Sequence, residues 1–150
     1  MAEIFGVTIK NRKEFRGHEG EPCTQGNIYQ NGKKIGYYSD SFMMGPVEYD
    51  FLEGGEKLFD EVVKKYFKKY PEEKDYYEIA DIFLYHLNNL INLEKEYKKA
   101  IKKGFVAIGE VEKGGVSKLY SIPEGAIEGF LREHENSKVY RSLNDFIITE

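Results

Sequence analysis

The chain of 150 residues contains no tryptophan, only one cysteine and only four prolines. The single thiol, Cys23, excludes an intramolecular disulfide and cannot by itself build a thiolate metal site, so we expect a reducing compartment. No apolar run approaches the roughly 20 residues that a membrane helix needs, and the first ten residues lack the basic and apolar regions of a signal peptide. These absences predict a cytoplasmic protein with no membrane segment.

Charge and aromatic rings are abundant. Charged residues make up 32% of the chain and aromatic residues 15%, with 12 tyrosines and 10 phenylalanines. The net charge of −4 argues against nucleic acid as the default partner. The length fits one domain spanning residues 1–150. Within it, residues 105–150 are a candidate small subdomain.

Alternating hydrophobicity predicts strands in the first third of the chain. Asn31-Gly32 favours a two-residue hairpin turn, because asparagine and glycine tolerate positive φ. The segment 11–26 is rich in glycine and charged residues and is predicted to form a polar loop. In the strand expected over residues 46–52, Glu48 and Asp50 alternate with Val47, Tyr49 and Phe51. One face of this strand is therefore expected to be solvated. The expected strands cover residues 4–10, 27–30, 34–39 and 46–52.

Helical periodicity begins after Gly54-Gly55. Apolar residues recur at helical spacing over residues 56–70, and Pro71 ends this amphipathic helix. A longer helix is expected over residues 75–103, with Asp75 as its cap and Gly104 as a left-handed terminator. Three asparagines near its middle leave open a bend or a split into two helices.

The last third predicts a second, smaller hairpin-helix unit. Strand patterns over 105–112 and 116–122 flank a Gly-Gly turn, and Ser121 with Glu124 resembles a capping box for a short helix. That helix is expected to bury Ala126, Ile127, Phe130 and Leu131. A last strand is expected from residues 138–140 and 146–149. The fold class is therefore α+β: an antiparallel sheet of hairpins packed against one amphipathic helix and one long helix.

Two clusters of ionisable residues invite a catalytic interpretation. His18, Glu19 and Cys23 could form a thiolate nucleophile, although a polar surface loop explains them better. Asp40, Glu48 and Asp50 could hold Mg²⁺ for phosphodiester hydrolysis, although a solvated strand face is the better account. We therefore expect no catalytic residue, no metal and no cofactor, and keep a small metal-dependent hydrolase as an alternative.

The remaining histidines and the helical lysines have structural interpretations. His86 should be hydrogen-bonded and partly buried within its helix, and His134 should suit a helix C-terminus. Nucleic-acid binding is a further alternative, and it requires Lys64, Lys68, Lys98 and Lys102 to lie on one face beside exposed tyrosines.

A short motif in the first third of the chain supports a resemblance. It comprises Phe15-Arg16-Gly17-His18-Glu19-Gly20, then Asn27-Ile28-Tyr29-Gln30-Asn31-Gly32-Lys33-Lys34-Ile35-Gly36, then Asp40. This layout resembles uncharacterised small proteins of phages and integrated mobile elements. The resemblance implies an accessory protein of a mobile element that acts inside a bacterial cell.

We therefore expect a non-enzymatic accessory protein that binds a macromolecule, most plausibly a protein, with counter-defence as one such role. The candidate binding surface is the aromatic hairpin and the loop after it, because tyrosine and methionine are favoured at interfaces. Its residues are Tyr29, Tyr37, Tyr38, Phe42, Met43 and Met44. The sequence leaves the identity of the partner and the oligomeric state open.

Overall fold

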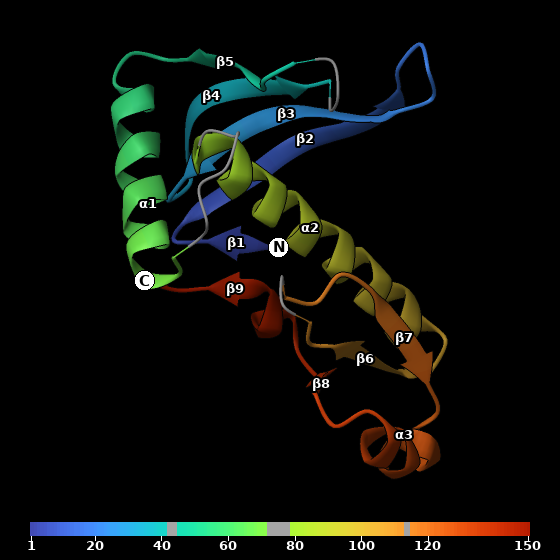
Figure 1. Ribbon diagram of the computed structural model, residues 1–150. Helices are drawn as coiled ribbons and strands as arrows, with labels where there is room; N and C mark the ends of the chain where they lie inside the picture. Colours follow the sequence, from blue (N-terminus) through green and yellow to red (C-terminus); the bar gives the residue numbers. More distant parts are fainter. Residues whose placement is uncertain (42–44, 72–78, 113–114) are drawn as a thin grey trace. The chain divides into compact units, whose positions relative to one another are not determined.

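The computed structural model describes residues 1–41, 45–71, 79–112 and 115–150 (Figure 1). The fold is α+β, as the sequence predicts, with one six-stranded and one three-stranded sheet. The chain forms two units, which we call the six-strand unit (residues 3–87 and 148–150) and the three-strand unit (residues 1–2 and 88–147). The long helix α2, Ile79–Lys102, contributes residues to both. No helix in the described ranges is long and apolar enough to cross a membrane.

The six-stranded sheet has the order β5-β4-β3-β2-β1-β9. Its neighbours from β1 to β5 pair antiparallel. The strands are β1 (Glu3–Ile4), β2 (Val7–Arg16), β3 (Pro22–Gln30), β4 (Lys33–Asp40), β5 (Glu48–Phe51) and β9 (Ile147–Ile148).

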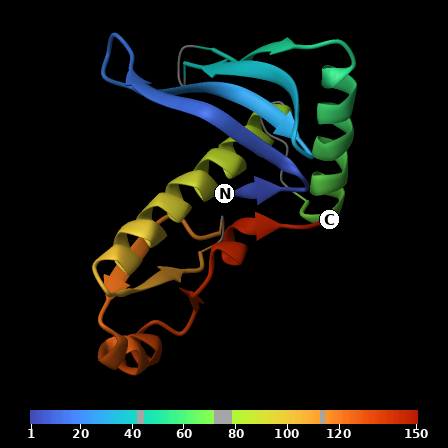
Figure 2. The same cartoon turned by 180° about the vertical axis from the view of Figure 1, so that it is seen from behind.

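Strands β2 and β3 are longer than the sequence predicts. The expected polar loop over residues 11–26 is mostly a two-stranded arm, in which Lys13 pairs with Gln25 and Arg16 with Pro22. The arm extends past β4 to a turn at residues 17–21 (Figures 1 and 2). The loop prediction was wrong because backbone pairing needs no alternation of apolar side chains, and most side chains of β2 beyond Lys10 are exposed.

Two tight turns shape the start of the sheet. The predicted turn at Asn31-Gly32 is confirmed, with φ of 49° and 84° between the paired residues Gln30 and Lys33. Phe5 and Gly6 repeat this geometry, with φ of 49° and 83°. The single strand expected over residues 4–10 is therefore two strands, β1 and β2, folded back on each other.

Helix α1, Gly55–Lys69, forms as predicted. Lys68 and Lys69 occupy its last turn, where a positive charge complements the helix dipole. Tyr66 of α1 is buried, and its hydroxyl lies 2.9 Å from Nδ1 of His86 on α2. This contact confirms the prediction of a hydrogen-bonded, partly buried histidine.

The described part of α2 is one uninterrupted helix, and the start expected at Asp75 lies outside the described residues. Gly104 ends it with φ of 78°. The Gly104 N–H donates to the Ile101 carbonyl at 3.0 Å, and the Phe105 N–H donates to the Ala100 carbonyl at 2.9 Å. These two bonds form a Schellman motif and confirm the predicted terminator.

The three-strand unit places β6 (Val106–Glu110) between β7 (Leu119–Ile122) and β8 (Ser137–Tyr140). Both predicted hairpin strands are shorter than expected. A core of α2 residues packs against Ala107, Leu119 and Tyr140. A second cluster joins Val106 and Ile108 to the short helix α3, Ile127–Glu133.

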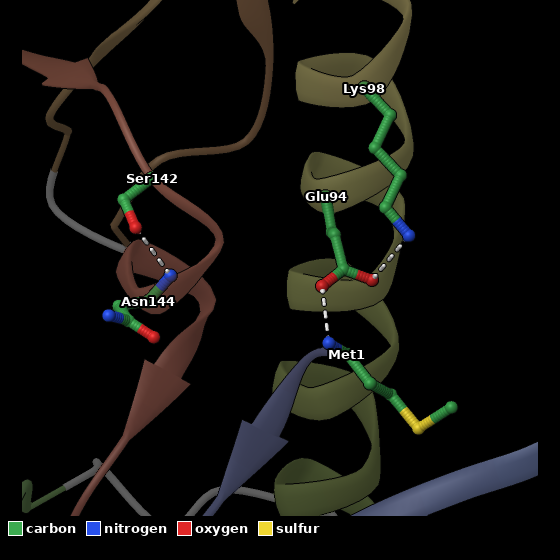
Figure 3. A network of polar contacts seen from close by, with 5 residues as sticks. All are labelled: Met1, Glu94, Lys98, Ser142 and Asn144. Atoms are coloured by element: carbon green, nitrogen blue, oxygen red, sulfur yellow. Dashed lines mark hydrogen bonds and ion pairs between the residues drawn. The ribbon is translucent and has the colours of Figure 1, made fainter.

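The caps in this unit differ from the prediction. Ser121 is exposed in β7, and the 3-10 turn η2, Glu124–Ala126, has no side-chain cap. Ile127 is buried, whereas Ala126 is exposed. A capping box occurs instead at Ser142, which precedes the 3-10 turn η3, Leu143–Phe146. The Asn144 N–H donates to Ser142 Oγ at 3.1 Å (Figure 3).

Glu94 is a buried carboxylate of the three-strand unit. Its Oε2 lies 3.2 Å from the amino group of Met1, and its Oε1 lies 3.7 Å from Nζ of Lys98 (Figure 3). Only 8% of the Glu94 side chain is exposed. The two cations offset the desolvation of the carboxylate, which would otherwise be strongly unfavourable.

Candidate functional site

Cross-strand pairing divides the side chains of β2–β5 between two faces of the sheet, because directly paired residues point the same way. One face is apolar. It carries Ile9, Ile28, Tyr38, Tyr49 and Phe51. The ring of Phe59 on α1 lies 5.7 Å from Tyr49 and 5.6 Å from Phe51. It also lies 5.6 Å from Phe83 on α2. This face forms the core of the six-strand unit.

The opposite face is polar and carries two aligned rows of side chains. In the first row, Lys10 pairs with Asn27, Asn27 with Tyr37, and Tyr37 with Asp50. The second row runs in the same way through Lys13, Gln25, Ser39 and Glu48. The lysines and carboxylates at the row ends are more exposed than the half-buried central residues. Each row therefore begins with a lysine on β2 and ends with a carboxylate on β5.

A β-bulge at Asn11 and Arg12 is what puts both lysines on one face. Residues 10 and 13 are an odd number of positions apart, so a regular strand would point them to opposite faces. Asn11 adopts φ of 54°, and the register shifts by one residue between Lys10 and Lys13. The same shift directs Arg12 inward, where only 8% of its side chain is exposed.

A third row extends this polar surface toward the hairpin turn. Thr8 pairs with Tyr29, and Tyr29 pairs with Lys34. The Nζ atom of Lys10 lies 4.4 Å from the centre of the Tyr29 ring, a cation–π contact. We call these three rows the open sheet face. Its residues are Thr8, Lys10, Lys13, Gln25, Asn27, Tyr29, Lys34, Tyr37, Ser39, Glu48 and Asp50.

The aromatic residues expected to bind a partner are divided by the sheet. Tyr29 and Tyr37 lie on the open sheet face and are half-buried. Tyr38 lies on the apolar face, is fully buried, and donates its hydroxyl to Thr24 Oγ1 at 3.3 Å. Its ring belongs to the core and offers no surface to a partner. Phe42, Met43 and Met44 lie outside the described residues.

The sequence pattern alone does not assign Lys10 and Lys13 to this surface. Lys10 could have been placed there, because Phe5, Val7 and Ile9 are expected to point the other way. Lys13 could not, because segment 11–26 reads as a loop and a bulge has no strong sequence signal. The tolerance of Asn11 for a left-handed backbone is the one available hint.

The pair His18 and Cys23 is not arranged as a nucleophile and base. His18 is exposed in the turn at residues 17–21, whereas Cys23 is 2% exposed and its Sγ lies 3.7 Å from the Glu21 carbonyl oxygen. Burial, together with the negative charges of Glu21 and Asp40, raises the pKa of Cys23 above its ordinary value. A thiol in these surroundings is protonated and weakly reactive.

The carboxylates expected as an alternative magnesium site are split between the two faces. Asp40 pairs with Thr24 on the apolar side of the sheet, whereas Glu48 and Asp50 lie on the open sheet face. Among the described residues, no group of three or more histidine, cysteine, aspartate or glutamate side chains could hold a metal ion.

Two of the three tyrosines beside the lysine-rich helix ends are buried, whereas Tyr70, after α1, is 43% exposed and its ring centre lies 5.5 Å from Lys69 Nζ. Lys64 and Lys68 lie in the six-strand unit, and Tyr66 between them is buried. Lys98 and Lys102 lie in the three-strand unit beside Tyr97, which is also buried. The rings of Tyr66 and Tyr97 belong to the cores, and the four lysines lie on the solvated sides of their helices.

A hollow of about 310 Å³ lies between the turns of the six-strand unit and α1. Its polar lining includes Glu3, Gln30, Lys65 and Glu150, and Lys65 Nζ lies 3.3 Å from a carboxylate oxygen of Glu150. Among the described residues that line this hollow, no hydroxyl or thiol is hydrogen-bonded to a general base. The open sheet face is therefore the stronger candidate for function.

Comparison with known proteins adds no relative, because no family model, curated protein or solved structure matches this chain.

Proposed function

We propose that this chain is a non-enzymatic protein that acts by binding a protein partner through the open sheet face. One observation carries the proposal: four paired strands present tyrosine, amide, hydroxyl and charged side chains in aligned rows on the side of the sheet opposite its core. Tyrosine brings a large contact area at a small entropic cost, and amides supply adaptable hydrogen bonds.

The charges of the face favour a protein over a nucleic acid. Lys10 and Lys13 stand on β2, but Glu48 and Asp50 stand at the other end of the same rows. A phosphate backbone that tracked the lysines would also meet these carboxylates, and the chain as a whole carries a net charge of −4. A protein surface can present both signs of charge and match this pattern.

The resemblance in the first third of the chain indicates the biological context in which the proposed binding would take place. Many residues of the motif shape this part of the sheet, since Gly32 forms the β3–β4 turn and Tyr29 lies on the open sheet face. An accessory role in a phage or an integrated mobile element, with counter-defence as one such role, would suit a small binding protein.

Affinity purification with matched baits tests the proposal. A tagged chain is expressed in a bacterial host as the wild type, as Tyr37→Arg in the centre of the open sheet face, and as Tyr85→Arg on α2. Tyr85 is the matched control because it is 67% exposed and lies on a helix. We expect mass spectrometry to find a protein retained by the wild type and by Tyr85→Arg but lost with Tyr37→Arg.

Two results would contradict the proposed function. The first is an identical set of captured proteins for all three baits together with no self-association of the chain, which would show that the face is not used. The second is steady, metal-dependent turnover of a generic phosphodiester by the purified wild type, which would favour the hydrolase alternative. Circular dichroism of each bait confirms that the substitutions leave the fold intact.

A further inference from the structure

The charge pattern of the open sheet face is complementary to itself. Lys10 and Asp50 end one row, and Lys13 and Glu48 end the next, with both lysines on β2 and both carboxylates on β5. Adjacent strands are about 4.8 Å apart, so the ends of a row are separated by roughly 14 Å. Within the described part of the chain, none of these four side chains forms an ion pair, so their charges are available to an external partner.

Symmetry determines how two such faces can meet. A two-fold axis parallel to the strands exchanges the β2 side of one copy with the β5 side of the other. Lys10 then lies opposite Asp50 of the second copy, and Lys13 lies opposite Glu48 of the second copy. A two-fold axis perpendicular to the strands and parallel to the sheets would place β2 of one copy over β2 of the other. Lysines would then face lysines. Only the first arrangement brings opposite charges together.

The central residues of the rows suit the same arrangement. Asn27 on β3 comes to lie opposite Tyr37 on β4 of the second copy, and Gln25 lies opposite Ser39 of the second copy. Amide and hydroxyl groups can both donate and accept, so these pairs can form hydrogen bonds across the axis. Two sheets packed face to face lie about 10 Å apart, a distance that side chains of this size can bridge.

We propose that two copies of this chain associate through their open sheet faces, related by a two-fold axis parallel to the strands. This inference rests on the proposed function and names its partner as a second copy of the same chain. The bulge at Asn11 is part of the interface, because it brings Lys13 onto the face and so gives the second row its positive end.

Charge exchange tests the arrangement. Lys10→Glu/Lys13→Glu makes all four row ends negative, and Glu48→Lys/Asp50→Lys makes all four positive. Sedimentation velocity over a concentration series should show a wild-type dimer, with self-association weakened roughly tenfold or more in each double variant. An equimolar mixture of the two double variants should recover a heterodimer, because every contact is then between opposite charges.

The quadruple variant is the matched control. It combines both exchanges, keeps the net charge of the wild type, and should self-associate as the wild type does. Recovery in the mixture and in the quadruple variant cannot arise from general changes in net charge or from unfolding. Thermal unfolding of each variant verifies that it is folded.

The outcomes distinguish this inference from the function on which it rests. A wild type that is monomeric at every concentration overturns the inference, as does a dimer that persists in both double variants. If the chain is monomeric but Tyr37→Arg loses a different captured protein, the inference fails and the proposed function stands. If the chain is monomeric and all baits capture the same proteins, both fail.

Discussion

Gly55, the first residue of α1, has no room for a side chain. A Cβ atom there would lie 2.0 Å from the backbone carbonyl oxygen of Ile35 on β4. That oxygen also accepts a hydrogen bond from the Leu52 N–H at 2.9 Å, so it cannot move without breaking another contact. We expect Gly55→Ala to lower the free energy of unfolding by about 3 kcal/mol or more, measured by urea denaturation.

Gly129 provides the control for this substitution. It lies inside α3, and a Cβ atom at this position would point into open space, with no neighbour within 4 Å beyond the adjoining helix backbone. Alanine is preferred to glycine within a helix, so Gly129→Ala should raise the free energy of unfolding by about 0.5–1 kcal/mol. If both substitutions had the same effect, close approach of α1 to β4 would not be the reason for Gly55.

Single residues were predictable where one strong preference determined them. His86 lies on a helix with an apolar stripe, and a buried imidazole needs a hydrogen-bond partner, which Tyr66 supplies. Phe5 was not predictable, because a phenylalanine rarely adopts φ of 49°. Its ring is buried and contacts Tyr66 at 5.6 Å, so packing outweighs the backbone preference.

The bulge in β2 depends on the left-handed backbone of Asn11. A β-branched residue avoids φ near 54°, so Asn11→Val should lower the free energy of unfolding by about 1–2 kcal/mol. Asn11→Gly should stay within a few tenths of a kcal/mol of the wild type, because glycine adopts this conformation readily. Urea denaturation of both variants provides the comparison.

Thr8→Val is the control for the effect on stability of introducing a valine into β2. Thr8 lies in the same strand at a regular extended position, where a β-branched residue is favoured. A loss of stability at Thr8 equal to that at Asn11 would contradict the role of the bulge. A loss confined to Asn11→Val would support it, and this variant should also weaken the dimer because the Lys13 row loses its alignment.

Elements with a strong local signal were predicted well. The two long helices, the Asn31-Gly32 turn and the strand that became β5 follow from periodicity and turn chemistry. The arm formed by β2 and β3 was missed because most side chains of β2 beyond Lys10 are exposed, so no apolar alternation marks the strand. The capping box at Ser142 was missed because the short 3-10 turn after it has almost no periodicity.

At the scale of the whole molecule, the candidate site was only partly visible in the sequence. Tyr29 and Tyr37 were identified from their residue type, but a sequence does not show which side chains from four strands share a row. That information lies in the strand registers, which shift at two places: between Lys10 and Lys13 in β2, and between Ile28 and Tyr29 of β3 in its pairing with β4. A one-residue shift moves a side chain to the other face.

The net charge of the whole chain opposes self-association, whereas the charge pattern of its open sheet face favours it. A net charge of −4 repels a second copy, and added salt screens this repulsion. The row ends attract a second copy, and salt screens that attraction as well. Lys10, Lys13, Glu48 and Asp50 meet at close range in the proposed dimer, whereas the net charge acts over longer distances.

The close-range attraction should therefore dominate the response to salt. We expect the dissociation constant of the dimer to rise roughly tenfold between about 0.05 M and 0.5 M sodium chloride, measured by sedimentation velocity. The quadruple charge-exchange variant should show the same change in dissociation constant. Each of its contacts still joins a lysine to a carboxylate, with the two strands that carry them exchanged. A dissociation constant that is unchanged or falls with salt would mean that apolar contacts or relief of net repulsion hold the copies together, and that the lysine–carboxylate pairs do not.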